Sequence, residues 1–169
     1  MSDWVIRPAG ETDTRWMAGD IYRLALTSED TGGAFAMCDA TIPPGGGPIP
    51  HVHKKSDEHY LMVEGELEFQ IGTERVTLAR GDSLNIRRGT LHGFRNVSIQ
   101  PARMIFMFTP AGPEGVFVAV GDVPVPATPV LPWGPERFTP ELLAALESND
   151  TFIPPPTEAD LDASELVSA

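Results

Sequence analysis

Residues 45–65 read GGGPIPHVHKKSDEHYLMVEG and place two histidines, His51 and His53, two positions apart, with Glu58 five residues later. A second stretch, GDSLNIRRGTLHGFRN over residues 81–96, adds His92, and all four histidines of the chain lie in these two stretches. Imidazole nitrogens and a carboxylate suit zinc, iron, copper, nickel and manganese. The pattern therefore predicts a site for one divalent transition metal ion, whose identity the residue types leave open.

The spacing of these residues predicts which side chains share a face. Side chains two positions apart on a strand point the same way, so His51 and His53 can reach one ion. Glu58 lies an odd number of residues beyond His53, and an unbroken strand would turn it to the other face. We therefore expect a turn or bulge over residues 54–57, after which Glu58 and Tyr60 point inward and His59 points outward.

Both stretches resemble the two sequence motifs of the cupin superfamily. The first motif is matched by Gly45, His51, His53, Glu58 and Gly65, and the second by Gly81, Gly89, His92 and Asn96. The chain departs from the pattern at Arg87, where the family has a turn-forming proline that binds no metal. The resemblance implies an all-β protein, a single cupin jelly-roll β-barrel, with the metal inside it on His51, His53, Glu58 and His92.

The order of apolar and turn-forming segments agrees with a barrel followed by a separate C-terminal region. Short strands are expected at residues 4–6, 21–26, 33–42, 60–63, 67–71, 76–78, 84–86, 93–97, 103–109 and 116–120. We expect the cupin barrel to span residues 1–125, and residues 126–169 to form a proline-rich connector, a short helix and an acidic tail. Thr139 and Pro140 have the residue types of a helix N-cap and first helical position.

Composition excludes several classes of function. The chain has 169 residues, one domain's worth, with 12 Lys and Arg against 24 Asp and Glu, a net charge of −12. Such acidity argues against binding nucleic acid or an anionic membrane. No apolar run is long enough for a membrane span, the first residues do not resemble a signal peptide, and Cys38 is the one cysteine. We therefore expect a cytoplasmic protein in which Cys38 is a buried core residue.

Aromatic and methionine residues are expected to line a pocket beside the metal. Alternation places Tyr60 and Phe94 inward, two residues beyond Glu58 and His92. Tyr60 either donates a hydrogen bond to a substrate or forms part of the wall. Further apolar side chains for the core and the pocket are Phe35, Met37, Met104, Phe106 and Phe108. Such walls suit a flat, apolar organic substrate better than a sugar phosphate.

Three hypotheses about function follow. The first is a dioxygenase acting on a flavonol-like or other aromatic enol or phenol, because residues 43–69 look like the small bacterial cupins grouped with quercetin 2,3-dioxygenases. Glu58 would then be both ligand and general base, with Tyr60 beside it. The second is a non-oxidative Lewis-acid enzyme, an isomerase, cyclase, dehydratase or lyase. The third is a small-molecule-binding cupin without turnover. The resemblance also implies a homodimer.

Overall fold

The chain is built mainly of short antiparallel strands, nine of them within residues 4–155, the part that this computed structural model describes. They are β1 (Thr14–Met17), β2 (Asp20–Leu26), β3 (Ala36–Ile42), β4 (Asp57–Glu64), β5 (Glu66–Ile71), β6 (Glu74–Ala79), β7 (Ser83–Ile86), β8 (His92–Arg95) and β9 (Ala102–Thr109). The helices are α1 (Ser28–Thr31), α2 (Gly115–Val120) and α3 (Pro140–Ser148), with 3-10 turns η1 (Ala9–Glu11) and η2 (Pro135–Arg137). None of these helices has the length and apolar character needed to cross a membrane.

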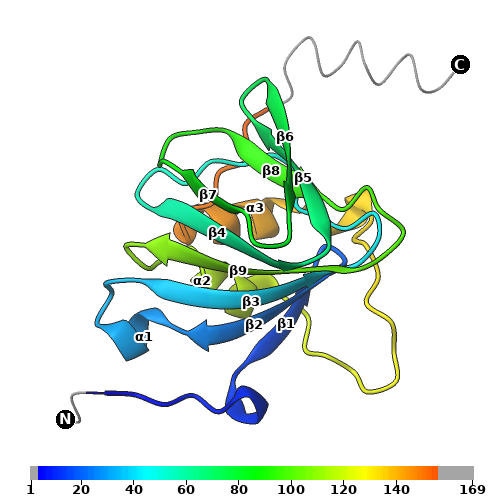
Figure 1. Ribbon diagram of the computed structural model, residues 1–169. Helices are drawn as coiled ribbons and strands as arrows, with labels where there is room; N and C mark the ends of the chain where they lie inside the picture. Colours follow the sequence, from blue (N-terminus) through cyan, green and yellow to red (C-terminus); the bar gives the residue numbers. More distant parts are fainter. Residues whose placement is uncertain (1–3, 156–169) are drawn as a thin grey trace, which may run out of the picture.

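The strands form two sheets, which Figure 1 shows curling together into a barrel. One sheet has the order β1-β2-β3-β9-β4-β7 and the other the order β6-β5-β8. Both sheets are antiparallel throughout, as the register of each strand pair shows. This arrangement confirms the predicted all-β jelly-roll barrel.

Residues of alternating size fill the space between the sheets. On β9 every second side chain, from Ala102 to Phe108, is buried, and β3 has the same alternation from Ala36 to Ile42. Small residues on β3 lie opposite large ones on β9, since Ala36 pairs with Phe108 and Cys38 with Phe106. Cys38 is fully buried, which confirms its predicted place in the core.

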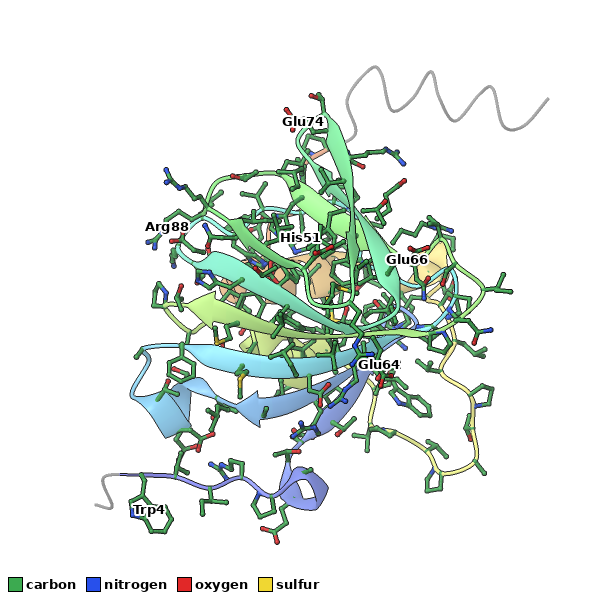
Figure 2. All side chains as sticks on the ribbon, in the orientation of Figure 1. Trp4, His51, Glu64, Glu66, Glu74 and Arg88 are labelled. Atoms are coloured by element: carbon green, nitrogen blue, oxygen red, sulfur yellow. The ribbon has the colours of Figure 1, made fainter. Side chains whose placement is uncertain are left out.

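Two of the predicted strands are wrong. Residues 116–120 form helix α2, because Val116 and Phe117, with Val120 one turn on, pack a helical face against the core. This tertiary packing overrides the strand preference of the valines. Residues 4–6 make no strand pairing, and Trp4 projects away from the molecule in Figure 2 with 70% of its surface exposed. β1 and the single-turn helix α1 are absent from the predicted elements, although Thr27 and Asp30, which form a capping box at the start of α1, are a sequence signal for a helix.

The predicted C-terminal helix is confirmed as α3. The hydroxyl of Thr139 accepts a hydrogen bond from the backbone N–H of Leu142 at 3.3 Å, and Pro140 occupies the first helical position. Leu142 and Leu146, one turn apart, are buried, whereas Leu143 is exposed. The connection between α2 and α3 leaves the body of the molecule as a long loop (Figure 1). The predicted acidic tail from residue 157 lies outside the described residues.

The buried carboxyl group of Asp20 holds in place, by a hydrogen bond, the glycine-containing loop that precedes His51. Asp20 has no exposed surface, and its Oδ1 accepts the N–H of Gly47 at 3.1 Å while Oδ2 accepts the hydroxyl of Tyr22 at 3.0 Å. Burial raises the pKa of Asp20 to about 7, and these two hydrogen bonds limit the rise. Gly47 has a φ of 127°, and a Cβ there would lie 2.0 Å from the carbonyl oxygen of Phe94. Only glycine fits at this close approach.

We expect Gly47→Ala to lower the free energy of unfolding by more than about 3 kcal/mol, because backbone strain and a clash with backbone atoms add together. Gly72 is the matched control, since its φ of 58° is also left-handed but a Cβ there would meet nothing within 4 Å. Gly72→Ala should cost only about 1–2 kcal/mol. Urea unfolding of both variants measures the difference, and equal losses would contradict the assigned role of Gly47.

Candidate metal centre

Four buried side chains converge inside the barrel. His51 and His53 follow the glycine loop, Glu58 lies on β4, and His92 begins β8. One ligand atom from each lies within 4.8 Å of the other three, and the exposed fractions of the four residues range from 1% to 8%. Figure 2 shows His51 deep in the molecule, whereas Arg88 points outward from the rim.

The backbone explains how separate segments meet at this point. His51 exchanges both backbone hydrogen bonds with His92, at 2.8 and 3.0 Å, which holds the two segments side by side. Residues 54–56 then turn, as predicted, before β4 begins at Asp57. Glu58 and Tyr60 are buried, while His59 on the other face binds the hydroxyl of Thr109 at 2.6 Å.

Each of the three buried imidazoles has its Nδ1 bonded to a backbone carbonyl. The acceptors are the carbonyl of Ile49 for His51 at 3.0 Å, that of Asp150 for His53 at 2.7 Å, and that of Thr90 for His92 at 2.9 Å. A carbonyl can only accept, so Nδ1 carries the proton in each ring. In the neutral ring the lone pair is then on Nε2, the form in which histidine binds a metal.

The Nε2 atoms are directed toward the carboxylate of Glu58. Nε2 of His92 lies 2.8 Å from Oε2 of Glu58, and Nε2 of His53 lies 3.4 Å from the same oxygen. Nε2 of His53 is fully buried and has no hydrogen-bond partner within the described residues. An orphaned buried nitrogen is costly unless something occupies the space in front of it. A metal ion would satisfy it.

The electrostatics of the cluster also suit a cation. Burial, together with the neighbouring His92 and His53, lowers the pKa of His51 to about 3, so this imidazole is neutral at pH 7. Burial alone would raise the pKa of Glu58, but the adjacent imidazoles outweigh burial and lower it. Glu58 is therefore a carboxylate. Burial lowers the pKa of His53, but the adjacent Glu58 outweighs burial and raises it, so without an ion this carboxylate attracts a proton to the neighbouring ring. A divalent cation in place of that proton would be held by the carboxylate and the imidazoles together, so the cluster fits a metal site.

A cavity of about 360 Å³ opens onto this cluster. Its polar lining includes His51, His53, Glu58 and Tyr60 from the cluster and its surroundings, and also Arg95 and Thr151. The rest of the wall is mainly aromatic and aliphatic, and includes Tyr22, Phe94, Phe106, Phe108, Phe117, Trp133, Phe138, Leu142, Leu146 and Ile153. The cavity is of a size and character typical of small-molecule sites.

The structure brings only some of the predicted pocket residues to this wall. Phe94, Phe106 and Phe108 line it, but Phe35, Met37 and Met104 do not. Met37 follows Ala36 on β3 and therefore points to the opposite face, where it pairs with Met107. Met104 faces inward but is fully buried in the packed core, and Phe35 precedes β3.

None of the pocket residues predicted from the sequence comes from the C-terminal region, which contributes directly to the site. Trp133, Phe138, Leu142 and Leu146 form one side of the cavity, and the carbonyl of Asp150 binds His53. The spacing of Leu142 and Leu146 predicted an apolar helix face. A local sequence pattern does not indicate which part of the protein such a face packs against. For Asp150 there was no signal at all, since it is 97 residues from its partner.

Comparisons with known proteins agree with the fold. Residues 39–108 match the cupin domain model. The chain is 32% identical over 109 residues to the tetracenomycin polyketide synthase protein TcmJ of Streptomyces glaucescens, covering 64% of this chain and 73% of that protein. It is 35% identical over 77 residues to quercetin 2,3-dioxygenase of Bacillus subtilis, which covers 46% of this chain but only 19% of the dioxygenase.

A solved structure shows the same fold. A Thermotoga maritima protein, described as a predicted oxalate decarboxylase, superposes with a TM-score of 0.57 at 18% identity. The match covers 62% of this chain and 97% of that one. The barrel is thus shared at low sequence identity, which supports the fold and carries no information on the reaction.

We expect His51→Ala and His92→Ala each to lower metal affinity by more than about 100-fold, because losing a ligand costs more than the 10–100-fold typical of outer partners. His59→Ala is the matched control, since His59 belongs to the same stretch but faces away from the cluster. Metal content after dialysis, measured by elemental analysis, should fall only in the first two variants. Full metal content in both would show that the four side chains are not the site.

Proposed function

Since the chain belongs to the cupin family, we propose that it is a metal-dependent enzyme, a dioxygenase acting on a flavonol-like or other aromatic enol or phenol. The observation that carries this proposal is the buried set of three imidazoles and one carboxylate at the base of an apolar cavity. His51, His53, Glu58 and His92 would hold one divalent ion, iron, manganese, nickel, copper or zinc. When bound, the ion supplies positive charge and open coordination positions for substrate oxygen atoms and, if it is redox-active, for dioxygen.

Glu58 and Tyr60 are the proposed catalytic residues. Glu58 lines the cavity as a carboxylate with a lowered pKa, so it can accept the proton of a substrate hydroxyl that the bound ion would make acidic, which leaves an electron-rich enolate or phenolate. The hydroxyl of Tyr60 is buried and has no hydrogen-bond partner among the described residues. Burial raises the pKa of Tyr60, so it keeps its proton at neutral pH and can donate a hydrogen bond to a substrate oxygen.

The wall of the cavity supports an aromatic substrate. Phe94, Phe106 and Phe108 from the barrel line the same space as Trp133 and Phe138 of the C-terminal region. Aromatic walls bind flat rings by stacking and edge contacts. Arg95 and Thr151 also line the cavity, but most of the wall is apolar, so a substrate with oxygen atoms near the histidine cluster and apolar rings elsewhere matches the cavity best.

A second candidate is non-oxidative chemistry on the same kind of substrate. The match to the polyketide synthase protein TcmJ favours it, because that match covers 73% of the relative, against 19% of quercetin 2,3-dioxygenase. The ion would then polarise a carbonyl, and Glu58 or Tyr60 would move protons during a cyclisation, isomerisation, dehydration or lyase reaction.

The proposal includes a cytoplasmic homodimer. Resemblance to small cupins supports the dimer, and the exposed side chains of Trp4 and Ile6 provide apolar surface near the N-terminus. Light scattering of the purified protein measures the oligomeric state directly.

Elemental analysis and oxygen consumption distinguish the two reactions. The protein is loaded separately with iron, manganese, nickel, copper or zinc and assayed with flavonols, catechols and polyphenolic polyketides. Oxygen uptake with a redox-active metal is expected. Product formation without oxygen uptake, including with zinc, would instead assign the Lewis-acid reaction. Absence of any bound metal would refute the proposed enzyme.

We expect Glu58→Gln to lower kcat by about 100-fold or more, the usual contribution of a general base, while metal affinity falls less. Glutamine keeps the size and one oxygen of the side chain but cannot accept the substrate proton at neutral pH. Tyr60→Phe should lower kcat/KM by about 2–10-fold, the value of one hydrogen bond. Steady-state kinetics at full metal loading measures both. Equal losses of metal affinity and turnover in Glu58→Gln would leave Glu58 as a ligand without a base role.

A further inference from the structure

The three histidines of the candidate centre differ in how their rings are held. His51 and His92 donate from Nδ1 to the carbonyls of Ile49 and Thr90, each two residues earlier in the same segment. His53 donates to Asp150, 97 residues later, at 2.7 Å, the shortest of the three contacts. One candidate ligand therefore depends on the C-terminal region for its orientation.

The end of α3 presents the carbonyl of Asp150 to His53. Asp150 has a left-handed backbone with a φ of 55°. Its N–H bonds the carbonyl of Glu147 at 3.1 Å, and the N–H of Thr151 bonds that of Leu146 at 2.9 Å. These two bonds form the Schellman motif that ends many helices. The carbonyl of Asp150 is thereby turned away from the helix and is available to His53.

The side chain of Asp150 binds the turn that follows His53. Its Oδ1 accepts the N–H of Lys54 at 3.1 Å, and its Oδ2 accepts those of Lys55 and Ser56 at 2.9 and 3.2 Å. Asp150 is 6% exposed, so these hydrogen bonds are shielded from water. A carboxylate that accepts several backbone N–H groups is held strongly. Asp150 thus accepts hydrogen bonds from the turn through its carboxylate and from the ring of His53 through its backbone carbonyl.

Neighbouring contacts hold the same two segments together. Val52 and Phe152 exchange both backbone hydrogen bonds, at 2.8 and 2.9 Å. The ammonium group of Lys54 lies 3.6 Å from the centre of the Phe152 ring, in cation–π contact. Residues 150–152 therefore lie beside residues 52–54, joined by the isolated β-bridge between Val52 and Phe152.

We propose that Asp150 is a positioning residue of the metal centre, which fixes the imidazole of His53 with its Nε2 directed toward the ion. The inference rests on the metal site of the proposed function and adds to it a residue outside both histidine-containing stretches. Without the hydrogen bonds of Asp150, the ring of His53 can rotate and the turn at residues 54–56 can move. The ion would then lose one well-oriented ligand.

The test is metal affinity, measured with Co²⁺ in competition with a chelator and by the visible absorption of bound Co²⁺. Asp150→Gly keeps the left-handed backbone but removes the carboxylate. Asp150→Asn keeps the shape but replaces one acceptor oxygen with a donor facing backbone N–H groups. We expect affinity to fall about 10–100-fold in Asp150→Gly, the usual effect of an outer partner, and less in Asp150→Asn. The Co²⁺ spectrum should change in both.

Asp122→Asn is the matched control. The Asp122 carboxylate also fastens the C-terminal region, through Trp133 at 3.2 Å and Arg137 at 3.0 Å, but it binds no residue of the cluster. The metal affinity of the Asp122→Asn variant should equal that of the wild type. Circular dichroism of each metal-free variant establishes whether it is folded. If Asp150→Gly does not fold, the metal affinity of Asp150→Asn is the test.

A double-mutant cycle with His53→Ala separates positioning from general destabilisation. If Asp150 acts through His53, adding Asp150→Gly to His53→Ala should cost little further Co²⁺ affinity. An equal fold-loss in both backgrounds, or wild-type affinity in Asp150→Gly, would overturn the assignment of Asp150 while leaving the metal site intact. Failure of the wild type to bind Co²⁺ would overturn the metal site itself, and the positioning role with it.

Discussion

Each buried imidazole donates one hydrogen bond to a backbone carbonyl, and this contact directs its other nitrogen toward a common point inside the barrel. The constraint is demanding because the donors come from separate segments of the chain. The backbone pairing of His51 with His92, the turn at residues 54–56 and the register of β4 must all be correct together. Glu58 then completes the set as a buried carboxylate, whose charge is tolerable because imidazoles surround it.

The sequence predicted the parts of this arrangement that depend on local spacing. Alternation along strands gave the inward faces of Glu58 and Tyr60, the outward face of His59 and the turn between His53 and Glu58. The proline-after-threonine signal gave the start of α3. Prediction from the sequence failed where tertiary packing decides the structure. In residues 116–120, valines that favour strands form a helix against the core. The prediction also placed Met37 in the pocket, but Met37 lies on the other face of β3 from the buried Ala36 and Cys38.

The cavity has two parts of different origin. The histidine cluster and the aromatic side chains of β8 and β9 lie within residues 39–108, which match the cupin domain. The rest of the wall comes from residues outside that match, at positions 17–22 and 113–153, with Trp133, Phe138 and Leu142 among its members. Cupins share the first part while catalysing many reactions, so differences in substrate are expected to reside in the second. In this chain the second part also contacts the candidate ligand His53, so the cavity wall and the candidate metal centre are joined physically.

The His53–Asp150 contact also has a consequence for how the protein is made. It closes a loop of 97 residues, and closing a flexible loop of that length costs roughly 4 kcal/mol of chain entropy. His51, His53, Glu58 and His92 leave the ribosome well before Asp150 does. A nascent chain therefore exposes all four donors while His53 is still free to turn, and the geometry that selects one ion over another is complete only after α3 has docked.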